Sequence, residues 1–274
     1  MRFGAHVSAA GGVAKALDRA AGMGADAAQI FLSSPRSWTF KPPDPLPDLA
    51  AAMAGAGIAS LVVHASYLIN LASPDEGISS KSVALLASTL AAADGFGIEA
   101  VVLHAGSHLG AGVEPALSRW AAAIEKALEG LSEVTLLLEN TAGGGGTLGR
   151  SIEELALLAS IAAQFGRVGV CLDTQHLFAS GYDLRDPSAL ADLGREVEHH
   201  FGRVNYIHLN DSKTGLGSNH DRHENLGEGE IGAAGLGSFL KLPAVAEAVT
   251  LLEVPGDGTG PRAADIVTAR GLLG

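Results

Sequence analysis

Short apolar runs alternate with longer amphipathic segments along the whole chain. The runs show no apolar–polar alternation, which is typical of strands buried on both faces of a parallel sheet. They lie at 3–5, 28–32, 60–63, 100–103, 135–138, 168–172, 204–209 and 250–252. The segments between them predict helices at 13–23, 47–54, 81–96, 115–131, 151–165, 187–201, 233–240 and 261–272.

This order of strand and helix predicts an α/β fold, and specifically a (β/α)8 TIM barrel. Ser151 and Glu154 have the spacing of a capping box at the start of one helix. A doubly wound open sheet is the competing fold, but no G-x-G-x-x-G pattern follows the first strand. Because no linker or repeat interrupts the pattern, we expect a single domain over residues 1–274.

Composition and charge narrow the classes of partner. The formal net charge of −12 argues against a general basic surface for nucleic acid and against an anionic membrane surface. It leaves room for a cleft made positive by bound metal. Cys171 is the one cysteine, so no internal disulfide forms. With no signal-peptide pattern or membrane-length apolar run, we expect a cytoplasmic protein in the bacterial cytosol or nucleoid.

Groups that bind metals recur where the predicted strands end. In a barrel the carboxyl ends of the strands share one rim, where active sites lie. The residues at those ends are His6, Ser33, His64, His104, Glu139, Asp173, His208 and Glu253. His176 follows Asp173 by three residues, and a glycine-rich loop carries Asp211, Asp221 and His223. Imidazole with carboxylate fits zinc, manganese or iron better than calcium or magnesium.

Several motifs resemble the endonuclease IV family of zinc-dependent apurinic/apyrimidinic endonucleases. The most specific are HLNDSK at 208–213 and DRHENLGEG at 221–229. The others, in the order of the family, are GAHVSAAGG at 4–12, HASYLINLASP at 64–74, HAGSH at 104–108, LENTAG at 138–143, CLDTQH at 171–176 and LEVPG at 252–256. The resemblance covers nearly the whole chain.

The resemblance implies a barrel that holds three zinc ions, with manganese possible in one position. His64 and His104 would bind the first ion, and Glu139 would bridge it to the second and be the catalytic carboxylate. Asp173, His208 and Glu253 would complete the second site. His176, Asp221 and His223 would hold the third. His6 is not a ligand in this pattern, and we expect it to form hydrogen bonds.

The implied activity is DNA repair. Three divalent ions outweigh four carboxylates, so the pocket would attract a phosphodiester and lower the pKa of bound water. The enzyme would cleave duplex DNA 5′ to an abasic site, leaving a 3′-hydroxyl and a 5′-deoxyribose phosphate. The family also suggests a monomer with no membrane partner.

Three residues resemble those that the family inserts into DNA: Arg36, Tyr67 and Leu68. An arginine with an aromatic–aliphatic wedge replaces stacking that is lost when a nucleotide is flipped out. Lys41, Lys213 and Arg222 are candidates for phosphate contacts or for solvated surface charge.

Some positions depart from the family pattern. Ala65, Ala105, Gln175 and Val254 stand where the family more usually has Asp, Pro, Cys and Thr. None of them is a ligand, so only the surroundings of the metals and the DNA contacts are affected. The main alternative function is a metal-dependent sugar isomerase or epimerase on the same barrel, which needs one or two metals and no third ligand set. A non-catalytic binder of metal or damaged DNA is a second alternative.

Overall fold

The computed structural model describes residues 1–130 and 133–274. Within these residues, eight parallel strands close into a barrel in the order β1-β10-β7-β6-β5-β4-β3-β2, with β1 paired to both β10 and β2. The strands are β1 (Arg2–His6), β2 (Ala27–Ile30), β3 (Ser60–His64), β4 (Ala100–His104), β5 (Thr135–Glu139), β6 (Val168–Asp173), β7 (Tyr206–Leu209) and β10 (Val249–Leu252). The predicted (β/α)8 TIM barrel, a single domain, is confirmed.

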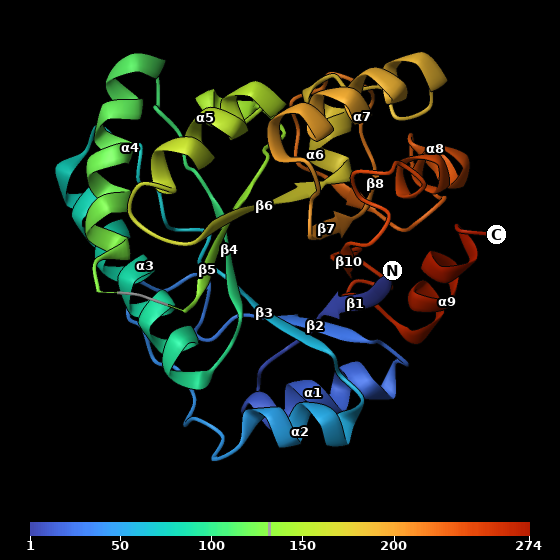
Figure 1. Ribbon diagram of the computed structural model, residues 1–274, viewed down its shortest axis with the longest axis horizontal. Helices are drawn as coiled ribbons and strands as arrows, with labels where there is room; N and C mark the ends of the chain where they lie inside the picture. Colours follow the sequence, from blue (N-terminus) through green and yellow to red (C-terminus); the bar gives the residue numbers. More distant parts are fainter. Residues whose placement is uncertain (131–132) are drawn as a thin grey trace.

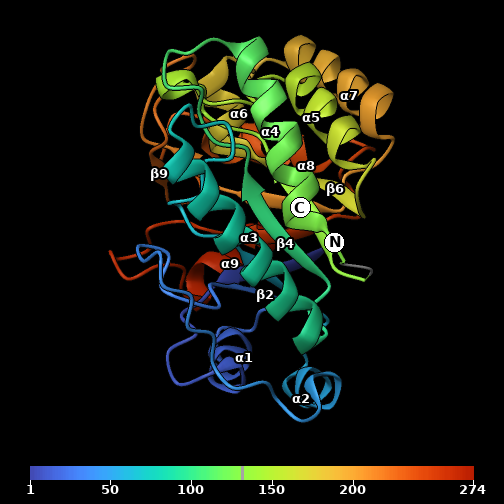
Figure 2. The same ribbon diagram turned by 90° about the vertical axis from the view of Figure 1, so that its left-hand side faces the viewer.

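Helices surround the barrel as an outer ring (Figure 1). They are α1 (Val13–Gly22), α2 (Leu49–Ala56), α3 (Glu76–Phe96), α4 (Val113–Leu128), α5 (Ile152–Ala162), α6 (Thr174–Ser180), α7 (Pro187–Phe201), α8 (Gly232–Leu240) and α9 (Ala263–Gly271). Figure 2 shows α3 and α4 lying side by side over β4. A short antiparallel pair, β8 (Asp211–Ser212) and β9 (His223–Glu224), lies in the loop after β7.

Helix boundaries differ from the prediction where a side chain caps the backbone. α3 begins five residues before the predicted start, because the Asp75 side chain accepts a hydrogen bond from the amide of Ile78. Ser151 caps α5 as predicted, but the Glu154 carboxylate accepts from the amide of Arg150 instead of completing the capping box. The helix predicted to Leu131 ends at Leu128, and Leu131 itself lies outside the described residues.

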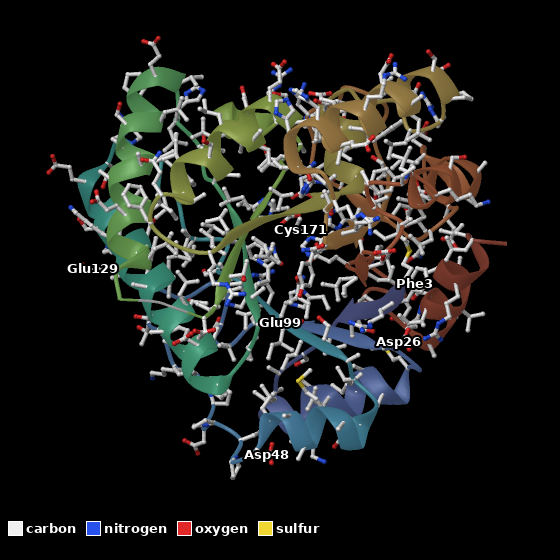
Figure 3. All side chains as sticks on the ribbon, viewed as in Figure 1. Phe3, Asp26, Asp48, Glu99, Glu129 and Cys171 are labelled. Atoms are coloured by element: carbon white, nitrogen blue, oxygen red, sulfur yellow. The ribbon has the colours of Figure 1, made fainter. Side chains whose placement is uncertain are left out.

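The core has two layers, one inside the barrel and one between the barrel and the helices. The inner layer contains small and medium side chains: Ala27, Val62, Ala100, Val102, Leu137, Cys171, Val249 and Leu251. Figure 3 labels Cys171, which is fully buried as predicted for a core residue. Gly4 is needed where β1 meets β2, since a Cβ there would approach the carbonyl oxygen of Ala27 to 2.3 Å.

In the part of the chain that the structure describes, no helix combines the length and apolar character needed to cross a membrane.

Candidate metal centre

Strand periodicity explains why the candidate ligands meet at one mouth. Side chains two residues apart in a strand point to the same face. The residue two positions after each inner apolar side chain therefore also faces the barrel axis, one step nearer the carboxyl end. Thus Val62 is followed by His64, Val102 by His104, Leu137 by Glu139, Cys171 by Asp173 and Leu251 by Glu253. The apolar inner layer is a floor beneath a polar layer.

Glu139 lies at the centre of this polar layer and is fully buried. Its Oε2 is 3.3 Å from His64 Nε2 and 3.2 Å from His104 Nε2. Its Oε1 is 2.9 Å from His208 Nδ1 and 3.4 Å from His176 Nδ1. One carboxylate thus faces two groups of imidazoles, which is the position expected of a bridging ligand.

A second group extends from Glu139 toward β10. Ligand atoms of Glu139, Asp173, His208 and Glu253 all lie within 4.8 Å of one another. His208 Nδ1 is 3.3 Å from Glu253 Oε2. The side-chain amide of Asn210 donates to Asp173 Oδ2 over 2.7 Å, so the orientation of Asp173 is fixed from outside the group.

The third predicted group forms through two local elements. The Asp173 side chain caps α6 by accepting from the backbone amide of His176 over 2.8 Å, which places His176 in the first turn of α6, just beyond the end of β6. The β8–β9 pair presents His223 to the same group. Asp221 lies between the two imidazoles, with its carboxylate oxygens 3.4 Å from His176 Nε2 and 3.4 Å from His223 Nε2.

The donor set fits divalent zinc. A tetrahedral zinc with bonds of about 2.0–2.1 Å separates its ligand atoms by about 3.3 Å. The distances of 3.2–3.4 Å in the first and third groups match that edge. His176 Nε2 and His223 Nε2 are also buried without a hydrogen-bond partner among the described residues. Orphaned buried nitrogens of this kind are costly unless something binds them.

Three of the five candidate ligand histidines are oriented by backbone carbonyls. His64 Nδ1 lies 2.7 Å from the carbonyl oxygen of Ala65, and His176 Nδ1 lies 3.0 Å from that of Asn140. His223 Nδ1 lies 3.3 Å from the carbonyl oxygen of Glu253. A proton on each Nδ1 leaves the lone pair of Nε2 free to bind a metal.

The electrostatics show how strongly the carboxylates and imidazoles interact. Burial alone would raise the pKa of Glu139, but the surrounding His104, His208 and His176 hold it well below its usual range. Burial lowers the pKa of His176, yet the charge of Asp173 and the contacts with Asp221 and Glu139 raise it well above 6.5. Protons therefore occupy positions in the metal-free site that a cation would take.

Asp211, in the same loop as Asp221 and His223, does not face this site. It is fully buried, and its carboxylate accepts hydrogen bonds from backbone amides at 2.8–3.3 Å. The donors are Ser212, Gly227, Gly229, Ile231 and Gly232. A Cβ on Gly229 would lie 2.6 Å from Asp211 Oδ1, so a glycine is required there. Asp211 thus holds the loop that carries the third group.

The strand-end prediction for Ser33 is wrong. β2 ends at Ile30, where its pairing with β3 stops, and the Ser33 hydroxyl accepts from the amide of Lys41 instead. The polar residue that β2 places in the mouth is Gln29, which is fully buried and contacts His208 and Glu253. His6 has the predicted hydrogen-bonding role: its Nδ1 lies 3.2 Å from Glu253 Oε1 and 2.9 Å from Gln29 Nε2, and it either donates to the carboxylate or accepts from the amide. Only the exact end of β2 could have identified Gln29 from the sequence.

The predicted DNA-facing residues lie around the mouth. Arg36 is exposed and lines a groove of about 1080 Å³ together with Lys41, Tyr67, His223 and Glu253. Tyr67 is 60% exposed and also lines a second hollow, of about 350 Å³, with His104, His176 and Asp221. Its ring packs on Phe31 with centroids 5.2 Å apart. Tyr67 therefore stands between two hollows that both reach the candidate ligands.

The other residues predicted to contact DNA are partly buried or already engaged with neighbouring groups of the protein. Leu68 is half-buried, unlike Tyr67 beside it. Lys213 pairs with Glu224 over 3.8 Å, and an Arg222 N–H donates to the carbonyl oxygen of Asp221. The positions that depart from the family pattern, Ala65, Ala105, Gln175 and Val254, are all buried.

Comparison with known proteins agrees with the geometry. A family model described as a xylose isomerase-like TIM barrel matches residues 17–273. A probable endonuclease 4 of Methanoculleus marisnigri is 41% identical over 277 residues, covering 99% of this chain and 98% of the relative. The crystal structure of endonuclease IV from Thermus thermophilus matches with a TM-score of 0.84 at 39% identity, covering 100% of this chain and 99% of that chain. The chain belongs to the endonuclease IV family.

The endonuclease IV barrel is shared with other enzymes. A D-tagatose 3-epimerase-like protein matches with a TM-score of 0.70 at 19% identity, covering 100% of this chain and 96% of that chain. At that identity the likeness concerns the fold alone. It gives the sugar-epimerase alternative no support beyond the common barrel.

Proposed function

We propose that this member of the endonuclease IV family is a DNA-repair endonuclease that hydrolyses duplex DNA 5′ to an abasic site. The products are a 3′-hydroxyl and a 5′-deoxyribose phosphate. The protein holds three zinc ions, with manganese possible in one position. It acts on DNA in the cytoplasm, as a monomer. The observation that supports this proposal most strongly is the third ligand group. A sugar epimerase with one or two metals does not need His176, Asp221 and His223 as ligands.

The ligands divide into three sets. His64 and His104 hold the first ion, and Asp173, His208 and Glu253 hold the second, with Glu139 bridging the two. His176, Asp221 and His223 hold the third. Bound zinc supplies Lewis-acid charge for the phosphate and makes water acidic enough to react near neutral pH.

The chain's own residues supply position and shape. Glu139 is held without exposure to solvent and in contact with imidazoles of three strands and α6, so its carboxylate keeps the ligand groups at fixed separation. Tyr67, its neighbour Leu68 and Arg36 enter the duplex where a nucleotide has left the stack. The flipped abasic residue then lies in the hollow beside His104 and Asp221.

The test is incision of a labelled duplex that contains one abasic site. We expect a single cut 5′ to the lesion, a 3′ end that a DNA polymerase extends, no cut in the intact duplex, and loss of activity with a chelator that zinc restores. Glu139→Gln is the inactive control, and Gln164→Met, on an exposed surface, is the active one. Chelator-resistant cutting, or cutting of intact duplex at the same rate, contradicts the proposal.

A further inference from the structure

Gln29 is a fully buried amide near the carboxyl end of β2, inside the polar layer of the barrel. Its Nε2 is 2.6 Å from Glu253 Oε1 and 2.9 Å from His6 Nδ1. Its Oε1 is 2.9 Å from His208 Nε2. Both polar atoms of the amide are therefore committed to partners inside the candidate metal centre.

Hydrogen-bond chemistry fixes the direction of this amide. A carboxylate only accepts hydrogen bonds, so the amide of Gln29 must turn its NH2 group toward Glu253. The reverse orientation would place two oxygens against each other in a buried site. The amide oxygen of Gln29 consequently faces His208, where it can only accept a proton from Nε2.

The tautomer of His208 follows from that contact. With Nε2 protonated toward Gln29, Nδ1 is the nitrogen left for a metal, and it faces Glu139 Oε1 at 2.9 Å and Glu253 Oε2 at 3.3 Å. Without a metal, Nδ1 donates a second proton to these carboxylates, because two lone pairs would otherwise face each other. His64, His176 and His223 have the opposite arrangement, with Nδ1 against a backbone carbonyl. His208 contacts the side-chain amide of Gln29 in place of a backbone carbonyl. A substitution of Gln29 can therefore remove the group that orients the His208 ring.

We propose that Gln29 is a positioning residue for one metal of the proposed three, the ion held by His208 and Glu253. The proposal rests on the zinc site of the proposed function. Gln29 holds His208 in the Nε2–H tautomer and anchors Glu253 through Oε1, so that both ligands face the same point. Its hydrogen bonds do not extend to the residues of the third ligand group.

A purely structural role would predict something different. Burying an amide among barrel side chains costs free energy unless every polar atom is paired, and an apolar side chain of the same length fills the space without that cost. Methionine has nearly the length of glutamine and lacks its donors and acceptor. If Gln29 only fills volume, Gln29→Met leaves metal binding unchanged.

The experiment measures zinc binding to the full chain directly, by competition with a chromophoric chelator and by native mass spectrometry. We expect wild-type protein and the matched control Gln164→Met to bind three zinc ions with the same affinities. We expect Gln29→Met to keep its circular dichroism spectrum and two unchanged sites, and to bind the remaining ion about 10- to 100-fold more weakly. If Gln29→Met binds zinc at all three sites as tightly as wild-type protein, or loses affinity equally at all three, the proposal is overturned.

A second variant and a second readout separate tautomer from packing. Gln29→Glu keeps an oxygen acceptor for His208 but loses the donor to Glu253, so we expect a loss confined to the same ion even if Gln29→Met fails to fold. The ¹⁵N shifts of His208 should report a protonated Nε2 and a metal-bound Nδ1 in zinc-loaded wild-type protein, and a changed pattern in Gln29→Met. An unchanged His208 tautomer would refute the assignment. A wild-type chain that binds fewer than three zinc ions would refute the proposed function instead.

Discussion

Replacing the buried carboxylate of Asp211 should destabilise the protein without removing a metal ligand. In Asp211→Asn, one oxygen becomes an NH2 group that faces the amides of Gly227 and Gly229. The other oxygen keeps its bonds to the buried amides of Ser212 and Ile231 but without charge. The variant keeps the shape of the side chain, so the effect reports the lost charge and hydrogen bonds and not a change in packing.

The magnitude follows from these contacts. Hydrogen bonds to a charged group contribute about 1 kcal/mol more than neutral ones, so the two retained bonds lose about 2 kcal/mol. The two lost bonds to glycine amides, which water can partly replace, add about 1–2 kcal/mol. For 274 residues the entropy of unfolding is about 0.6 kcal/mol/K, so a loss of about 3–4 kcal/mol lowers Tm by roughly 5–7 °C.

Thermal unfolding of zinc-free protein, followed by circular dichroism, measures this change. The control is Asp18→Asn, at an exposed Lys15–Asp18 pair on α1, for which we expect a change of less than about 1 °C. A drop below about 1 °C for Asp211→Asn would refute the structural role. A drop seen only in zinc-loaded protein would instead make Asp211 a metal ligand.

Further predictions concern the site itself. Glu139→Gln should abolish incision and reduce bound zinc while leaving the fold intact, and near-normal cleavage would reject its bridging role. Tyr67→Ala should weaken binding to abasic duplex more than to intact duplex in a titration, whereas an equal loss would reject the wedge. Although burial lowers the pKa of His176, Asp173, Asp221 and Glu139 raise it well above 6.5. The stability that protonated His176 gives the folded protein is fully present below pH ~6.5 and is lost as pH rises through the raised pKa. The Tm of zinc-free protein should therefore fall over that range. A flat profile would contradict this.

Much of the fold follows from the sequence because strand burial leaves a simple pattern. A strand covered on both faces is a short apolar run, so the runs ending at His64, His104 and Glu139 identify their strands and, by the common rim, their neighbours in space. The family resemblance then groups these side chains by metal. The structure adds distances and burial, and the ligand roles themselves stay proposals.

The sequence could not predict features that depend on where hydrogen bonding stops or how a loop closes. The apolar run of β2 continues through Phe31 and Leu32, but its ladder stops at Ile30, so the sequence pattern points to Ser33 and not to Gln29. Asp211 and Asp221 lie in one loop with the same chemistry. Only the folded backbone of residues 227–232 turns the first of them away from the mouth.

The central claim is that side chains from distant strands hold three divalent ions at one barrel mouth. Native mass spectrometry of the zinc-loaded chain measures this directly, with His176→Ala as the variant that removes a ligand of the third group alone. We predict three zinc ions per wild-type chain and two in the variant. One ion per wild-type chain, or the same number in both proteins, would contradict the account.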